Sequence, residues 1–211
     1  GAIPQDRTSE RGLAMTTTRD RLLDEAEALF ARTGVAAVTT REIVEAAEQR
    51  NTSAVSYHFG SREGLLRAIL VRRGGPIDHQ RGAMRDELGE QPSLHDLVAC
   101  LVVPYAAALA DPGGRSYLRI VAQLRGRFAV WRVESDVTTT KGLARILDEI
   151  ELRPDASAAL RRERVVALIM VMTGPIAERA RSIDEGLDPE LSHDQFVANL
   201  VDMCSALMGA S

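Results

Sequence analysis

The sequence predicts an all-α protein with a small N-terminal domain of short helices and a larger helical C-terminal domain. Runs of alternating Val, Ile and Thr, which are typical of strands, do not occur in its 211 residues. Helix-capping patterns recur instead, and apolar side chains follow them at helical spacing. The composition, 45% hydrophobic and 27% charged, is that of an ordinary globular protein. Cys100 and Cys204 have apolar neighbours and are expected to be buried, reduced thiols.

The first two helices are predicted from their capping patterns. Thr17-x-x-Asp20 opens the first helix, whose apolar positions recur every three or four residues. Gly34 ends it, because glycine tolerates the left-handed backbone that often follows a helix. Thr39-x-x-Glu42 opens a short second helix.

A break in the helical pattern predicts the domain boundary. Gly74-Gly75-Pro76 interrupts the fourth helix, because glycine weakens a helix and proline lacks the backbone N–H. Residues 1–16 are expected to form a flexible arm, residues 17–74 the N-terminal domain and residues 75–211 the C-terminal domain. Further helices are expected over 76–88, 93–109, 114–125, 138–152, 155–181 and 192–208, and the segment 126–137 has no clear pattern.

The segment 39–66 has the organisation of a helix-turn-helix, with two short helices around a turn at 48–51 and a third helix behind them. The second short helix can dock through an apolar inner face of Ala54, Val55 and Phe59. Its outer face is suited to approach DNA, because small hydroxyl side chains permit close contact while Tyr and His reach farther. The residues that can point outward are Thr52, Ser53, Ser56 and Tyr57.

These residues resemble the TetR family of helix-turn-helix regulators, over about residues 17–70. The family pattern is close to T-x-R-x-I-A-x-x-A-G-V-S-x-x-x-x-Y-x-H/Y-F-x-S-K-x-x-L. The chain matches it at Thr39 or Thr40, Arg41, Ile43, Ala46 or Ala47, Tyr57, His58, Phe59, Ser61, Arg62 and Leu65. The resemblance implies a DNA-binding homodimer. The residues expected to contact DNA are Thr39, Thr40, Arg41, Arg50, Asn51, Thr52, Ser53, Ser56, Tyr57, His58, Ser61 and Arg62.

The chain departs from the family pattern in the turn. Glu48-Gln49 stands where the family has glycine, and Arg50-Asn51 makes the turn one residue longer. Arg62 replaces the usual Lys and keeps its charge. The sequence therefore leaves the register of the reading helix open.

Charge and motifs narrow the function. Residues 1–73 carry 11 basic and 10 acidic side chains, whereas the rest carries 15 and 20, which suits a DNA-facing head on an acidic body. No G-x-S-x-G, G-x-G-x-x-G or P-loop motif occurs, and the four histidines lack metal-ligand spacing, so no enzyme, cofactor or metal site is expected. A helical-bundle enzyme, marked by perturbed titratable groups, and an adaptor, marked by Glu48 and Glu63 blocking the reading face, remain alternatives.

The apolar segments indicate where the protein is found and how it assembles. The stretch 97–110 is too short to span a bilayer and no signal peptide is visible, so a cytoplasmic protein is expected. The segment 165–172 is apolar on all sides, and the final helix carries two apolar stripes, so one can face a partner subunit. The homodimer interface is predicted at Val166, Ile169, Val197, Val201, Cys204 and Met208.

Aromatic side chains in the middle of the chain suggest an effector pocket, although they would serve equally as plain core. The candidates are Tyr105, Tyr117, Gln123, Phe128, Trp131 and Met170. The sequence thus predicts a transcriptional repressor that an unknown small molecule releases from a near-palindromic operator.

Overall fold

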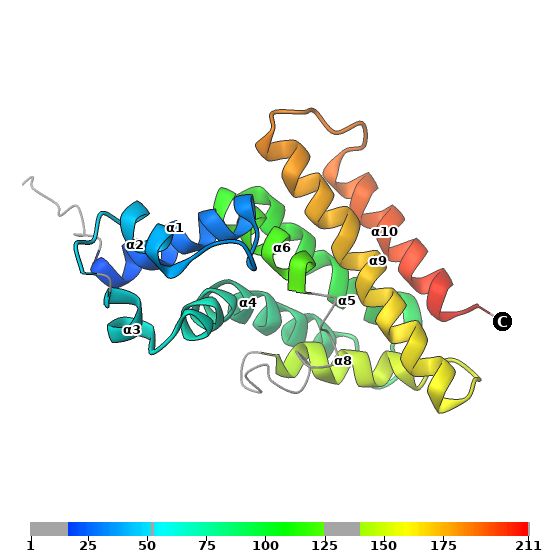
Figure 1. Ribbon diagram of the computed structural model, residues 1–211. Helices are drawn as coiled ribbons and strands as arrows, with labels where there is room; N and C mark the ends of the chain where they lie inside the picture. Colours follow the sequence, from blue (N-terminus) through cyan, green and yellow to red (C-terminus); the bar gives the residue numbers. More distant parts are fainter. Residues whose placement is uncertain (1–16, 52, 125–139, 211) are drawn as a thin grey trace, which may run out of the picture.

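A computed structural model describes residues 17–51, 53–124 and 140–210, and over these ranges the chain is helical without strands. The helices form a head and a body that a long helix joins (Figure 1). The head consists of α1 (Thr18–Thr33), α2 (Thr40–Ala46), α3 (Ala54–Phe59) and the start of α4 (Arg62–Glu87). The body adds α5 (Leu94–Ala107), a 3-10 turn η1 (Ala108–Ala110), α6 (Pro112–Leu124), α8 (Lys141–Glu151), α9 (Ala158–Asp184) and α10 (His193–Met208).

The predicted helix starts in the head are confirmed. The Thr17 hydroxyl accepts a hydrogen bond from the backbone N–H of Asp20 at 3.1 Å. Thr39 and Glu42 form a reciprocal capping box at the start of α2. Gly34 ends α1 with φ 112°, a backbone conformation that strains other residues.

The expected break at Gly74-Gly75-Pro76 was wrong, because α4 continues through it as one helix of 26 residues. Tertiary packing accounts for the difference. A Cβ atom on Gly74 would lie 2.9 Å from the Tyr117 hydroxyl, so the glycine allows α6 to approach α4 closely. Contacts with α1, α5, α6 and α8 stabilise α4 as one continuous helix through residues that weaken isolated helices.

The head and the body have separate hydrophobic cores that α4 and α6 connect. The head core contains fully buried Leu22, Phe30, Ile43 and Leu65, and Ile120 of α6 completes it. The body core is built from α4, α5, α6, α8, α9 and α10. Because α6 contributes to both cores, it links the head to the body.

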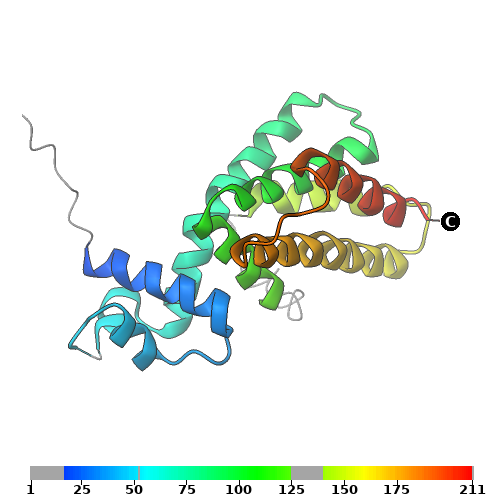
Figure 2. The same cartoon turned by 90° about the horizontal axis from the view of Figure 1, so that it is seen from above.

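The two last helices, α9 and α10, pack against each other along one side of the body (Figures 1 and 2). The stripe of α10 that was predicted to meet a partner faces the protomer's own core instead: Val201, Cys204 and Met208 are at most 3% exposed and Val197 is half-buried. Ile169 of α9 is buried as well. Val201, Cys204, Met208 and Ile169 have almost no surface left to bury against a second chain, so the predicted interface needs correction at these four positions, whereas half-buried Val197 keeps some free surface.

The cysteines agree with the sequence, since Cys100 and Cys204 are both free and buried. Burial raises the pKa of the Cys204 thiol to about 11, which keeps it protonated and unreactive at neutral pH. Among the described residues, no helix combines the length and the apolar character needed to cross a membrane.

Candidate DNA-binding interface

The geometry of the turn at 48–51 determines where the second short helix, α3, begins. Glu48 adopts φ 55°, the left-handed conformation for which the family uses glycine. The Asn51 side-chain oxygen accepts a hydrogen bond from the backbone N–H of Ser53 at 2.9 Å. The backbone carbonyl of Asn51 accepts a second one from the backbone N–H of Ala54 at 3.0 Å. The helix α3 therefore begins at Ala54 and docks through buried Ala54 and Val55.

The outward face of α3 combines one large exposed aromatic ring with small polar groups. The Tyr57 side chain is 83% exposed, the largest exposure among the described large hydrophobic residues. Ser53 and Ser56 are exposed beside it, and half-buried His58 packs edge-on against the Tyr57 ring at 4.9 Å. Most of the Tyr57 ring therefore remains free to contact a partner.

Phe59 supports this face from behind, as expected for a residue of the inner surface. It is half-buried, and the guanidinium of Arg19 lies 5.1 Å from its ring centroid. This contact brings a cation from α1 next to the end of α3. Sequence reasoning missed Arg19, because nothing in the spacing of α1 indicates that its first turn reaches Phe59.

The remaining predicted DNA contacts surround α3 on exposed backbone and side chains. Thr39, Arg41, Arg50, Asn51 and Ser61 are exposed, Thr40 is half-buried, and Thr52 lies outside the described residues. The Thr39 backbone N–H and hydroxyl both donate to the Glu42 carboxylate at 2.7 Å. These hydrogen bonds hold the pKa of Glu42 below its ordinary value. Arg41 pairs with Glu45 at 2.7 Å but keeps most of its side chain in solvent.

Arg62 does not belong to this exposed group. Its guanidinium donates to the backbone carbonyls of Val38, at 3.0 Å, and Val35, and lies 5.1 Å from the centroid of the Phe30 ring. The side chain therefore ties the start of α4 to the loop between α1 and α2. The sequence could not indicate this structural role, because the two carbonyls lie 24 and 27 residues away.

Gln123, a predicted effector residue, also joins the head to the body. Its amide nitrogen donates to the Phe30 carbonyl at 3.0 Å, and its amide oxygen accepts from the Val35 N–H at 2.7 Å. Both bonds satisfy backbone groups at the end of α1. The side-chain amide of Gln123 therefore already has hydrogen-bond partners in the head.

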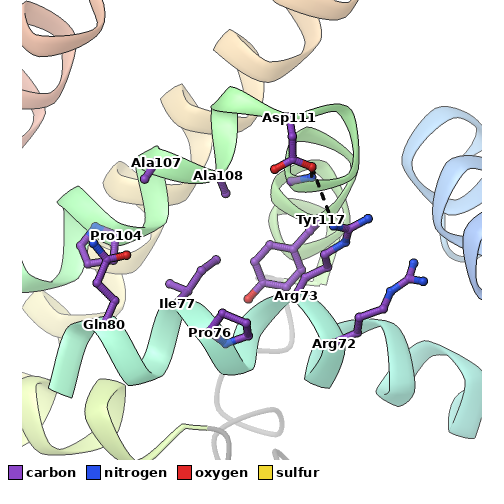
Figure 3. A pocket seen from close by; sticks show the side chains of 11 residues that line it. Arg72, Arg73, Pro76, Ile77, Gln80, Pro104, Ala107, Ala108, Asp111 and Tyr117 are labelled. Atoms are coloured by element: carbon purple, nitrogen blue, oxygen red, sulfur yellow. Dashed lines mark hydrogen bonds and ion pairs between the residues drawn. The ribbon is translucent and has the colours of Figure 1, made fainter. Parts of the chain in front are cut away.

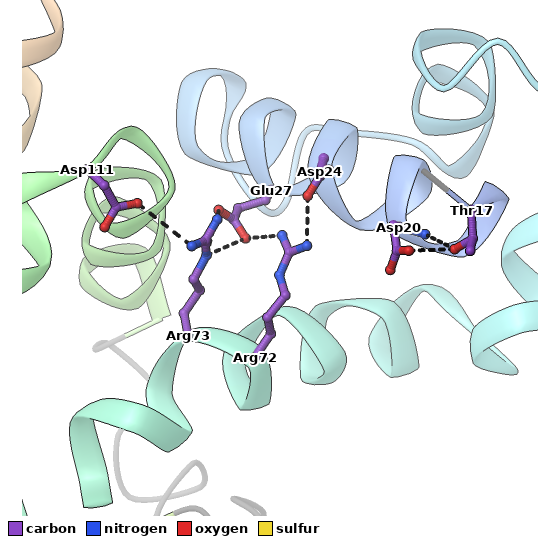
Figure 4. Close-up of polar contacts among 7 residues, drawn as sticks. All are labelled: Thr17, Asp20, Asp24, Glu27, Arg72, Arg73 and Asp111. Atoms are coloured by element: carbon purple, nitrogen blue, oxygen red, sulfur yellow. Dashed lines mark hydrogen bonds and ion pairs between the residues drawn. The ribbon is translucent and has the colours of Figure 1, made fainter. Parts of the chain in front are cut away.

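A second connection between head and body is an ion-pair cluster around Glu27 of α1 (Figure 4). The Glu27 side chain is only 4% exposed, and it accepts from Arg72 at 2.5 Å and Arg73 at 2.8 Å. Arg72 also pairs with exposed Asp24 at 2.7 Å, and Arg73 lies 3.7 Å from Asp111 before α6. Sequence reasoning missed this cluster, although Glu27 follows Leu23 by four residues on the buried face of α1.

A cavity of about 260 Å³ lies beside this cluster, between α4 and the segment from α5 to α6 (Figure 3). Of the predicted effector residues, Tyr117 lines it. Tyr105 is buried behind Tyr117, with the ring centroids 6.2 Å apart and edge to face. Met170 is 48% exposed on α9, away from the body core, while Phe128 and Trp131 lie outside the described residues.

Comparison with known proteins agrees with the helix-turn-helix geometry. The sequence profile described as "Bacterial regulatory proteins, tetR family" matches residues 22–69, which run from α1 into α4. The chain is a TetR-family transcriptional regulator. This family consists of DNA-binding proteins rather than enzymes. No curated protein matches the sequence significantly.

Solved structures share the fold of this TetR-family regulator over nearly its whole length. NalD, the secondary repressor of the MexAB-OprM multidrug efflux pump in Pseudomonas aeruginosa, is 19% identical, with a TM-score of 0.58, covering 89% of this chain and 93% of NalD. Mycobacterium smegmatis AmtR is 20% identical, with a TM-score of 0.55 and coverages of 95% and 90%. A TetR-family regulator from Streptomyces coelicolor is 22% identical, with a TM-score of 0.51 and coverages of 94% and 98%.

Proposed function

We propose that this regulator is a homodimeric repressor that binds a near-palindromic operator through α3 and leaves it when a small effector binds the body. The observation that carries the proposal is the outward face of α3, where Tyr57 is 83% exposed and Ser53 and Ser56 are exposed as well. Such a tyrosine presents both an apolar ring and a hydroxyl, which can contact the sugar and phosphate groups of DNA. The docked inner face of α3 holds it rigidly for that partner.

The proposed contacts fall into two groups. Ser53 and Ser56 are small enough to approach base edges, and they are assigned to sequence reading. Tyr57, with His58, reaches the phosphate backbone and fixes the position of the head. Residues at the starts of α2 and α4 and in the turn before α3 are assigned to further phosphate contacts. They are Thr39, Thr40, Arg41, Arg50, Asn51 and Ser61.

The proposed dimer forms through the surfaces of α9 and α10 that the body leaves uncovered. Val166 is 40% exposed, and Met170 and Met203 are each 48% exposed. On α10, Met203 lies on the second apolar stripe with partly buried Phe196 and Leu207. A two-fold axis here sets two α3 helices about 34–36 Å apart, one turn of DNA.

The repressor mechanism follows from the links between head and body. An effector that alters α4 or α6 changes the orientation of the head, because Gln123 and the Glu27 cluster couple the two parts. The ligand must bind the two arrangements with different affinity to release DNA. The comparison with NalD, itself named a repressor, supports this direction of regulation.

An operator selection with the purified full chain tests the function. Random duplexes bound at low and moderate salt are expected to yield a sequence with two-fold symmetry, and binding is expected to weaken as salt rises, since phosphate contacts release counterions. Recovery of no enriched sequence under either condition contradicts the proposal.

Two single substitutions separate reading from structural support. Tyr57→Ala is expected to weaken operator binding about tenfold without changing thermal stability, because the ring is exposed. Arg62→Ala is expected to lower the free energy of unfolding by about 1–3 kcal/mol, because two partly buried carbonyls lose a charged donor. Fluorescence anisotropy and urea unfolding measure the two effects. A Tyr57→Ala protein with full operator affinity would show that α3 is not the reading helix.

A further inference from the structure

The cavity beside the Glu27 cluster has one apolar wall and one charged edge (Figure 3). The apolar wall comes from α4, α5 and η1 and consists of Pro76, Ile77, Pro104, Ala107 and Ala108. The polar lining consists of Arg72, Arg73, Gln80, Asp111 and Tyr117. Such a division suits an amphipathic molecule with an apolar body and one polar end.

The charged edge of the cavity favours a ligand whose polar end is an anion. Two guanidinium groups line the cavity against the single carboxylate of Asp111, which lies 3.7 Å from Arg73. Arg72 has its Nε buried without an acceptor in the described part of the chain. Arg73 fits closely against Gly113, where a Cβ atom would lie 1.8 Å from its guanidinium nitrogen. The chain thus leaves room for this guanidinium at the start of α6.

We propose that this cavity binds a small organic monocarboxylate, whose carboxylate competes with Glu27 for Arg72 and Arg73. Planar guanidinium groups recognise carboxylates with paired hydrogen bonds. Asp111 disfavours a second negative charge, so the ligand is a monoanion. The volume of about 260 Å³ lies just below the range of drug-sized sites, which favours a single ring or a short branched chain as its body.

Competition with Glu27 links this site to the DNA-binding head, and this step rests on the proposed repressor function. Glu27 is 4% exposed, so it depends on the two arginines for compensation of its charge. A ligand that draws Arg73 into the cavity weakens the tie between α1 and α4. By reciprocity, a head held on operator DNA must lower the affinity of the acid by the same factor.

Titration calorimetry on the full chain without DNA tests the site. Benzoate and phenylacetate are the probes, and benzamide and phenylacetamide are their uncharged counterparts. The acids are expected to bind at least about tenfold more tightly than the amides, because only the acids pair with guanidinium charge. Ala108→Leu, which fills the apolar wall, is expected to abolish binding of the acids. Equal binding of acids and amides, binding of neither, or unchanged binding in Ala108→Leu overturns the proposal.

A substitution that keeps the shape of the side chain but removes its charge tests the competition itself. Glu27→Gln removes the competing charge and is expected to tighten acid binding about tenfold. Asp24→Asn is the matched control, because Asp24 also pairs with Arg72 but is 57% exposed, and it is expected to leave the affinity unchanged. Unaltered affinity in a folded Glu27→Gln protein overturns the competition. Release of operator is measured separately by anisotropy, so an acid that binds without releasing DNA leaves the site standing and contradicts only the proposed repressor mechanism.

Discussion

Replacing Met203 with Arg is expected to separate the proposed dimer into monomers and to remove nearly all operator affinity. Met203 is 48% exposed on the outer side of α10. In a monomer, a charge at this position stays in water and costs little. In a dimer it would be buried without a partner, where desolvation costs several kcal/mol. The same reasoning applies to Met170→Arg on α9, which has the same exposure.

The loss of operator affinity follows from the loss of the second head. Two linked heads gain from a high effective concentration on the second half-site, so a monomer is expected to bind about 100-fold or more weakly. Light scattering reports the mass and anisotropy the affinity. Leu152→Arg is the control, because Leu152 is 71% exposed at the end of α8 and the same charge there is expected to change neither value. A Met203→Arg protein that remains dimeric would place the interface on another surface.

Replacing Glu27 with Ala is expected to produce the second large effect, a loss of about 3–5 kcal/mol in the free energy of unfolding. The substitution removes the common partner of Arg72 and Arg73 and leaves their partly buried charges without compensation (Figure 4). Burial alone would lower the pKa of Arg72, but its hydrogen bonds to Glu27 and Asp24 outweigh burial and raise the pKa. Because a guanidinium group is not deprotonated in proteins, a loss of Glu27 leaves the two positive charges in place.

Asp24→Ala provides a direct comparison, because Asp24 pairs with the same arginine from the surface. Its side chain is 57% exposed, so its removal is expected to cost less than about 1 kcal/mol. Urea unfolding followed by circular dichroism compares the two proteins. If Glu27→Ala and Asp24→Ala were equally stable, the Glu27 cluster would contribute no more to stability than an ordinary surface ion pair.

The sequence by itself predicted those features that depend on neighbours in the chain. The capping pairs Thr17–Asp20 and Thr39–Glu42 span three residues, so their hydrogen bonds form wherever a helix starts there. The apolar spacing of each helix and the spaced residues of the helix-turn-helix are local in the same sense. They were sufficient to predict an all-α protein, its helix-turn-helix and its family, but they left open the register of the helix that is proposed to read DNA.

Only the tertiary structure decided how the helices use their surfaces. It showed which stripe of α10 is core, because both stripes are apolar and only packing against α5 and α9 distinguishes them. Tertiary packing also keeps α4 helical through Gly74-Gly75-Pro76, where the Tyr117 hydroxyl fills the space beside Gly74. The ties between head and body join residues 46 and 88 positions apart, as in Arg73–Glu27 and Gln123–Val35. The packing of the folded chain determines which residues pair at such separations. No local pattern in the sequence indicates which distant side chain a charged group or an amide will contact.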